Sequence, residues 1–90
     1  MRSHTTKRFR RAFNNLPPEI QRRTERAYEL FEQDPGHPSL RFKKVHAVES
    51  IYSVRITRDY RALGLRKEND IFWFWIGSHD AYERLLQSGL

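Results

Sequence analysis

The hydrophobic repeat of the chain changes once, at Asp34-Pro35-Gly36, and this change limits the folds available to it. Before that turn the apolar residues recur at the three- and four-residue spacing of helices, and after it they alternate or run together as in strands. Helices followed by a group of strands are typical of α+β domains. A chain of 90 residues has room for one modest core, so we expect a single domain over residues 1–90.

A pair of helices is predicted before the turn. The first, from about Thr6 to Asn15, carries an apolar stripe among basic residues, made by Phe9, Ala12, Phe13 and Leu16. Leu16-Pro17-Pro18 ends it, because proline disfavours helix in the residue before it. Pro18 can begin the second helix, whose N-terminal dipole Glu19 complements. The tight connection predicts an antiparallel helical hairpin.

The rest of the chain is predicted to form antiparallel strands and one more helix. The expected strands are a short one at Leu40–Val45, then Ile51–Ile56, Tyr60–Leu65 and Ile71–Ile76. The last of these is apolar on both faces, as in a strand covered from both sides. Gly77-Ser78 is expected to break it, and a short helix should follow over Asp80–Gln87.

Charge is the most informative property of the composition. Lys and Arg total 17 against 11 acidic residues, which gives a formal net charge of +6. Arginine binds phosphate through a planar fork, so this excess fits nucleic acid or the ribosome, although an acidic protein partner or plain solvation fits equally well. The absence of cysteine excludes thiolate metal sites and suits the cytoplasm, where we expect the protein. No apolar run is long enough for a membrane, and no histidine or carboxylate spacing indicates a metal or cofactor.

Several segments, in their order and spacing, carry a family resemblance over most of the chain. They are Leu16 to Gln21, Asp34-Pro35, His37 to Leu40, Lys43-Lys44, Tyr52 to Ile56, Asp59 to Leu63, and Trp75 to Tyr82. With them the chain resembles the RelE/ParE superfamily, the toxins of type II toxin–antitoxin systems. The resemblance implies an N-terminal helical hairpin packed on a small twisted antiparallel sheet of three or four strands, with a short C-terminal helix. It also implies a cognate antitoxin protein as partner.

The resemblance suggests catalytic residues if the chain cleaves RNA. That reaction needs a base for the 2′ proton, cations for the phosphate and an acid for the 5′ oxygen. Arg55 and Arg61 lie on neighbouring predicted strands and are candidates to hold one phosphate. His79 follows the last strand, where an imidazole can serve as acid or base, and Tyr82 resembles a family tyrosine that orients substrate.

Each candidate also has an ordinary structural explanation. The arginines could be solvated surface charges, His79 a neighbour of a helix cap, and Tyr82 part of the core. Arg41, Lys43 and Lys44 match the basic strand that faces RNA in RelE-like members, and each could equally be a solvated charge.

The function therefore stays open between three alternatives. The first is a metal-independent endoribonuclease that cleaves mRNA on the ribosome. The second is a ParE-like poison of DNA gyrase that hydrolyses nothing. The third is a non-toxic relative that only binds an antitoxin. The resemblance specifies the fold more closely than the activity.

Overall fold

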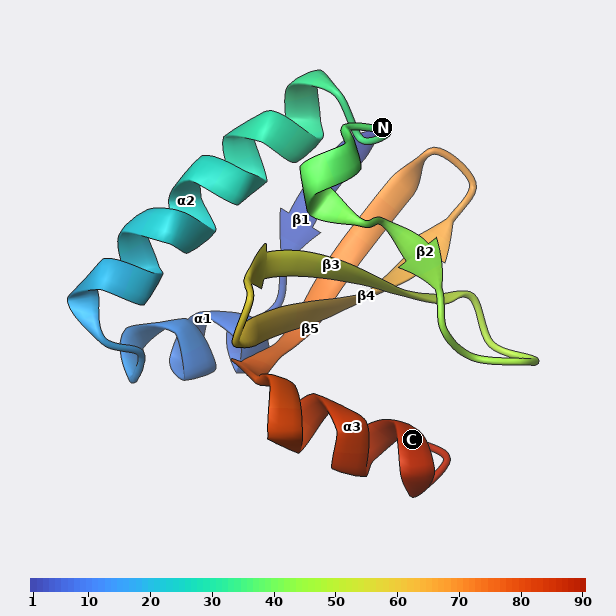
Figure 1. Cartoon of the computed structure of the whole chain (residues 1–90). Coiled ribbons are helices and arrows are strands. Elements are labelled where there is room, and N and C mark those ends of the chain that lie inside the picture. The colour runs from blue at the N-terminus through green and yellow to red at the C-terminus, as the bar shows by residue number, and fades with distance from the viewer.

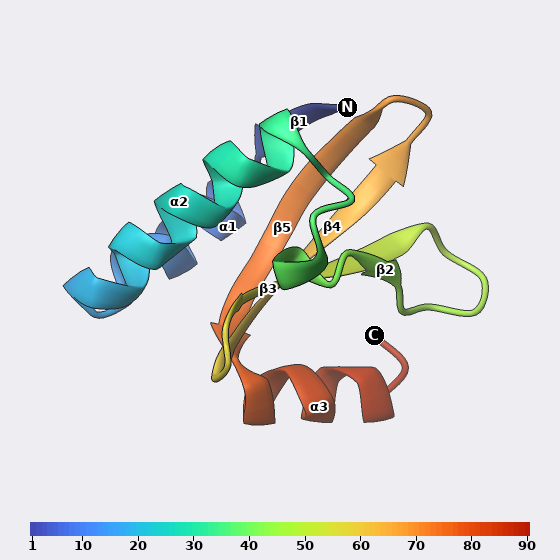
Figure 2. The same cartoon turned by 45° about the horizontal axis from the view of Figure 1, so that its top comes forward.

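Helices cover both faces of one twisted sheet in the computed structural model, which describes all residues from Met1 to Leu90 (Figures 1 and 2). The elements follow in the order β1 (Arg2–Thr5), α1 (Lys7–Asn14), α2 (Pro18–Gln33), the 3₁₀ turn η1 (Pro38–Leu40), β2 (Lys43–Lys44), β3 (Ile51–Thr57), β4 (Tyr60–Lys67), β5 (Asp70–Ser78) and α3 (His79–Gln87). The predicted α+β class is confirmed. Helices α1 and α2 lie on one face of the sheet, and α3 lies across the other (Figure 2).

The two N-terminal helices begin and end where their sequence signals indicate. Thr6 caps α1 by accepting a hydrogen bond from the Phe9 N–H at 3.1 Å, and Asn15 is the C-cap. Helix α2 begins at Pro18, whose missing N–H would have no partner in the first turn of a helix. Helix α1 packs against β5 and α2 against β3, so the predicted packing of both helices on the sheet is confirmed.

The sheet is larger than predicted and is mixed rather than antiparallel. It has five strands in the order β1-β5-β4-β3-β2, and β1 pairs with β5 in parallel. The prediction of three or four antiparallel strands was wrong because β1 carries little strand signal of its own. Its partner lies at the other end of the chain, with Ser3 opposite Ile71. Side chains hold it there: the Trp73 indole donates to Ser3 Oγ at 2.7 Å, and the Tyr28 hydroxyl donates to the Ser3 carbonyl at 2.9 Å.

A charged contact ties the start of β1 to the start of β5. The Asp70 carboxylate accepts from His4 Nε2 at 2.8 Å and from Arg2 Nη2 at 2.9 Å. The hydrogen bond from His4 and the one from Arg2 lower the pKa of the Asp70 carboxyl. A carboxyl with a lowered folded pKa stabilises the fold above its unfolded pKa, near ~4, and this stabilisation is lost as the pH falls through the folded pKa.

We therefore expect Asp70→Asn to reduce the free energy of unfolding at neutral pH, and the difference from the wild type to shrink as the pH falls below ~4. Urea unfolding of both proteins across this range measures the difference. Glu68→Gln is the control, because Glu68 is an exposed residue of the β4–β5 turn. A difference between Asp70→Asn and the wild type that stayed constant with pH would contradict this assignment.

The predicted strand Leu40–Val45 was largely wrong. Pro38–Leu40 forms η1, and only Lys43 and Lys44 pair with β3. The reason is the backbone of Arg41, which adopts the left-handed conformation with φ 47°. A residue in that conformation cannot continue a strand, so pairing starts only after it.

The predicted break at Gly77-Ser78 was also wrong, since β5 continues through Ser78. Gly77 lies opposite Arg61 in the sheet, and a Cβ there would come within 2.6 Å of the Trp75 ring. Glycine is thus required by the indole that covers it rather than by a turn. A register shift between Leu63 and Gly64 places Phe74 as an extra residue, so Trp73 and Ile76 both reach the face of α1 and α2.

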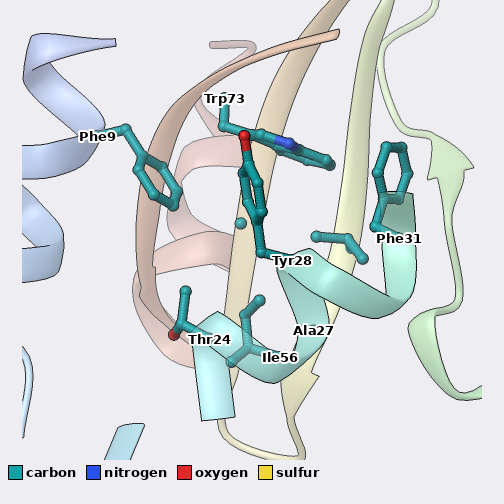
Figure 3. A pocket seen from close by; sticks show the side chains of 9 residues that line it. Phe9, Thr24, Ala27, Tyr28, Phe31, Ile56 and Trp73 are labelled. Carbon is teal, nitrogen blue, oxygen red and sulfur yellow. The ribbon is translucent and has the colours of Figure 1, made fainter. Parts of the chain in front are cut away.

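The core has a part on each face of the sheet. The larger part, between the sheet and α1 and α2, includes Phe9, Phe31 and Trp73; the smaller, under α3, contains Ile51, Leu63 and Tyr82. Figure 3 shows the side chains around a cavity of about 20 Å³ in the larger part. Its polar member, Thr24, donates its hydroxyl hydrogen to the Ile20 carbonyl at 2.7 Å. A space of this size holds little more than a water molecule, so it is not a substrate site. No helix is both long and apolar enough to cross a bilayer.

Candidate anion-binding site

Arg55 and Arg61 face each other directly across the β3–β4 hairpin. Because residues opposite each other in an antiparallel pair project to the same side, both side chains lie on the face that carries α3. Ser53 and Tyr82 share this face, joined by a hydrogen bond from the tyrosine hydroxyl to Ser53 Oγ at 3.3 Å. The predicted convergence of the two arginines follows from this register.

The two arginines line an open groove between the sheet and α3 that encloses about 460 Å³. Its wall is mostly polar and basic, with contributions from Arg41, Lys43, Lys44, Ser53, Arg55, Arg61, His79, Tyr82 and Glu83. Every residue proposed from the sequence as catalytic or RNA-binding therefore lies around one groove. In the sequence these residues extend from Arg41, at the end of η1, to α3, and the fold brings them together (Figure 1). We call this the α3 groove.

Arg61 is held in place by the turn that precedes it. Its Nη1 donates to the carbonyl oxygens of Thr57 at 2.7 Å, Tyr60 at 3.0 Å and Arg58 at 3.2 Å. These bonds use one nitrogen of the guanidinium, and they fix the plane of the whole group. Arg61 is thus both a groove cation and a structural support of the β3–β4 turn, a second role that no pattern in the sequence indicates.

The groove concentrates more positive charge than Glu83, the carboxylate in its lining, can neutralise. Burial lowers the pKa of the Arg61 guanidinium, and the like charges of Arg55 and Arg41 act in the same direction. Arg55 is half-buried, and its guanidinium makes no hydrogen bond or ion pair within the chain. A bound anion would relieve the repulsion between these groups, which is why clustered and perturbed cations mark anion sites.

His79 is the first residue of α3 and lies at the end of the groove. Its backbone N–H donates to the Asp59 carbonyl at 2.7 Å, which joins the helix to the β3–β4 turn. Its Nε2 lies 3.5 Å from Glu83 Oε1, one helical turn further on. The imidazole is 40% exposed, so a substrate in the groove can reach it. Glu83 orients the ring, and the four-residue spacing to His79 on a predicted helix was a signal that could have identified it.

The position of Tyr82 differs from the expectation that this tyrosine contacts the substrate directly. Its side chain is only 5% exposed and packs with Ile51 and Leu63 under α3. The ring centre lies 5.8 Å from that of His79, and the hydroxyl is bound to Ser53. In this position Tyr82 supports the groove wall and the histidine, and its face is not free to stack on a base.

The basic residues of the β2 region divide between two faces. Lys43 pairs with Ser53, which puts it on the groove side, whereas Lys44 pairs with Tyr52, which packs on the α2 side. Both lysines are exposed, and both contribute to the groove rim. Arg41 reaches the groove from the end of η1 because of its left-handed backbone.

The sequence model of one protein family covers the site and most of the fold. The description of the family is ParE-like toxin domain, and the match extends over residues 18–84. The chain belongs to this ParE-like toxin family. The match begins at the first residue of α2 and includes Arg41, Arg55, Arg61, His79 and Tyr82. The wider resemblance to the RelE/ParE superfamily is thereby confirmed, and the ParE-like chain is a toxin of the kind found in toxin–antitoxin systems.

Solved structures share the fold of this ParE-like domain at low sequence identity. A chain of the RelB–RelE antitoxin–toxin complex of Methanococcus jannaschii is 16% identical, with a TM-score of 0.73 over 91% of this chain and 96% of that one. YafQ of Escherichia coli strain BL21(DE3) is 8% identical, with a TM-score of 0.72 over 91% and 98%. A chain of the toxin–antitoxin complex RelBE2 of Mycobacterium tuberculosis is 20% identical, with a TM-score of 0.68 over 87% and 96%. A comparison with curated proteins gave no match.

Proposed function

We propose that this ParE-like toxin is a metal-independent endoribonuclease that cleaves mRNA on the ribosome and so inhibits translation. The observation that supports it most is the arrangement of Arg55, Arg61 and His79 around one open groove. The α3 groove combines fixed cations with an accessible imidazole, which supply the phosphate-binding charge and one of the two proton-transfer groups that cleavage by a 2′-hydroxyl requires.

In the proposed reaction, the 2′ oxygen attacks the neighbouring phosphorus and the bond from phosphorus to the 5′ oxygen breaks. Arg55 and Arg61 stabilise the negative charge that develops on the phosphate oxygens. His79 carries one of the two proton transfers, either taking the 2′ proton or giving a proton to the departing 5′ oxygen, and solvent water carries the other. Tyr82 acts as a positioning residue through its contacts with His79 and Ser53. Arg41, Lys43 and Lys44 bind the phosphates on either side, and no metal or cofactor takes part.

The proposed partners are an antitoxin, the ribosome and mRNA, which would act in the cytoplasm. The solved complexes from Methanococcus jannaschii and Mycobacterium tuberculosis contain an antitoxin with the toxin. A net charge of +6 favours an antitoxin segment that is acidic and lies on the basic face. Such a segment over the α3 groove would silence the toxin.

Substitution of Arg55 tests the proposal with little risk to the fold. We expect Arg55→Ala to reduce mRNA cleavage by about tenfold to a hundredfold, because a hydrogen bond to a charged group contributes about 1.5–3 kcal/mol. Arg61→Ala is a weaker test, since it also removes the bonds to the turn carbonyls. The measurement is primer-extension mapping of mRNA 5′ ends after induction in cells, with growth followed in parallel.

Arg84→Ala is the matched control for Arg55→Ala. Arg84 is exposed on α3 and lies outside the α3 groove, so its loss removes the same charge without touching the site. We expect it to cleave like the wild type. Growth arrest by the wild type with all mRNA intact would contradict the endonuclease proposal, as would full cleavage by Arg55→Ala.

The second candidate function is a ParE-like, non-hydrolytic poison of DNA gyrase. It is favoured by the burial of Tyr82, which leaves the α3 groove with a single accessible imidazole and no free aromatic ring for stacking. A poison of this kind would leave mRNA intact, induce the DNA damage response and co-purify with gyrase. A relative without toxicity would produce neither effect when induced alone.

A further inference from the structure

A second groove lies on the other side of Arg55, away from α3. It is formed by α2, η1 and the end of β3 and encloses about 500 Å³. In Figure 2, η1 follows the C-terminal end of α2 and lies close to β3, and its residues Pro38, Ser39 and Leu40 line part of the groove. The floor includes Ala27 and Leu30 of α2, and the rim carries Arg23, Arg26, Arg41 and Arg55. We call this the α2 groove.

The α2 groove is lined by arginines without any carboxylate. The acidic residues of α2 do not line the groove. Glu19 forms its ion pair with Arg22, and the more distant charges of Arg23 and Arg26 also lower the pKa of its carboxyl. Arg23 and Arg26 are exposed, and the guanidinium of neither residue makes a hydrogen bond or an ion pair. By contrast, the α3 groove contains Glu83. The α2 groove is therefore the more purely cationic of the two, and an anion is the ligand that its chemistry fits.

The two grooves are adjacent, and Arg41 and Arg55 line both. The position of Arg41 is maintained at a conformational cost. Its φ of 47° is in the left-handed region, which is unfavourable for a non-glycine residue. A glycine would adopt this backbone conformation more easily. We therefore attribute the arginine at this position to its side chain, which lies between the two grooves.

We propose that the α2 groove continues the α3 groove as one track for a single strand of RNA. The inference rests on the proposed function: a strand with its reacting phosphate between Arg55 and Arg61 reaches the α2 groove where it passes Arg41. The next phosphates along it would then bind Arg23 and Arg26. Four of the eleven residues that line the groove are arginines and none is acidic, which favours a polyanion held by its backbone over a protein segment held by apolar side chains.

Direct binding tests the track without requiring cleavage. The probe is a fluorescein-labelled 2′-O-methyl RNA of about twelve nucleotides, which keeps the phosphates and blocks the nucleophile. The 2′-O-methyl trinucleotide is the short reference. Fluorescence anisotropy with the full chain gives the affinity for both, at several salt concentrations. The variant is Arg23→Ala with Arg26→Ala. The matched control is Arg22→Ala with Arg84→Ala, which removes the same charge from exposed positions outside both grooves.

We expect the Arg23/Arg26 variant to bind the long RNA about tenfold more weakly or worse, and to bind the trinucleotide like the wild type. The salt dependence of log K should fall by about 0.7 for each phosphate that the variant no longer neutralises, hence about 1.4 in all. The Arg22/Arg84 control should keep its affinity and salt dependence. Both double variants should unfold at the wild-type temperature, because all of the substituted residues are exposed.

Three results would overturn the track. The first is an equal loss of RNA affinity in both double variants, which indicates that only the total charge matters. The second is no loss of RNA affinity in either double variant. The third is a wild-type protein that binds the long RNA no more tightly than the trinucleotide. Loss of binding to an acidic antitoxin peptide with RNA binding unchanged would assign the groove to the protein partner instead. Failure of the proposed function is a separate result: mRNA would stay intact on induction, whatever the anisotropy shows.

Discussion

His79→Ala is expected to reduce mRNA cleavage by about a hundredfold to ten-thousandfold, which is the usual contribution of a positioned general acid or base. The expectation depends on the imidazole, which is accessible at the end of the α3 groove and oriented by Glu83. The variant should fold normally. The backbone N–H of residue 79 makes the bond to the Asp59 carbonyl that joins α3 to the turn, and alanine keeps it.

The test of this expectation is a cleavage assay with purified ribosomes and mRNA over a range of pH. The cleavage rate of the wild type should depend on pH, and the limb of the profile that His79 contributes should disappear in His79→Ala. A structural role would lower the rate without changing the shape of the profile. Glu83→Gln is the companion variant, since it preserves the helix and weakens only the orientation of the ring. We expect it to lose far less activity than His79→Ala.

Undiminished cleavage by His79→Ala would remove the chemical basis of the endonuclease proposal. Growth arrest that persisted in the same variant, with mRNA intact, would support the gyrase alternative. The arginine cluster would then remain as a binding surface for another anion. The variant thus separates the two toxic mechanisms with one protein.

Gly64→Val is expected to have the largest effect on stability. Gly64 lies opposite Trp73 in the middle of the β4–β5 pair. A Cβ at this position would come within 2.7 Å of Trp73 Cε3 and 2.8 Å of Ile71 Cγ1. Both neighbours are buried, at 3% and 0% exposed, so neither can move aside without disturbing the core. We expect a loss of about 3 kcal/mol or more, a large part of the ~5–15 kcal/mol that stabilises a small domain.

Urea unfolding of Gly64→Val against the wild type measures this loss. Gly36→Val is the control, because a Cβ at Gly36 would meet only Asp34 Oδ1 at 3.8 Å. The control should change stability by less than about 1 kcal/mol, as is usual for exposed sites. If Gly64→Val were as stable as the control, the close approach of Trp73 to β4 would be wrong.

Local signals predicted much of the candidate site. The sequence could place Arg55 and Arg61 on neighbouring strands of one hairpin, but their direct pairing did not follow from the turn. The turn pairs Thr57 with Tyr60, and a regular ladder would then put Ile56 opposite Arg61. A register shift between Arg55 and Thr57 brings Arg55 there instead. His79 could be placed at the strand end because the apolar run of β5 is followed by helical spacing. The sequence could not decide whether Tyr82 belongs to the core or to the site, because its spacing in the C-terminal helix fits both positions.

Residue patterns over short stretches were enough to predict the helices, the β3–β4–β5 meander and the basic character of the chain, since these depend on periodicity, proline and charge. Three features became visible only in the folded chain: the pairing of β1 with β5, the burial of Tyr82, and the approach of Arg23 and Arg26 to Arg41 and Arg55. These contacts join residues far apart in the chain. Which of these long-range contacts form depends on the arrangement that buries the apolar surface of the whole chain best. No short segment contains that information.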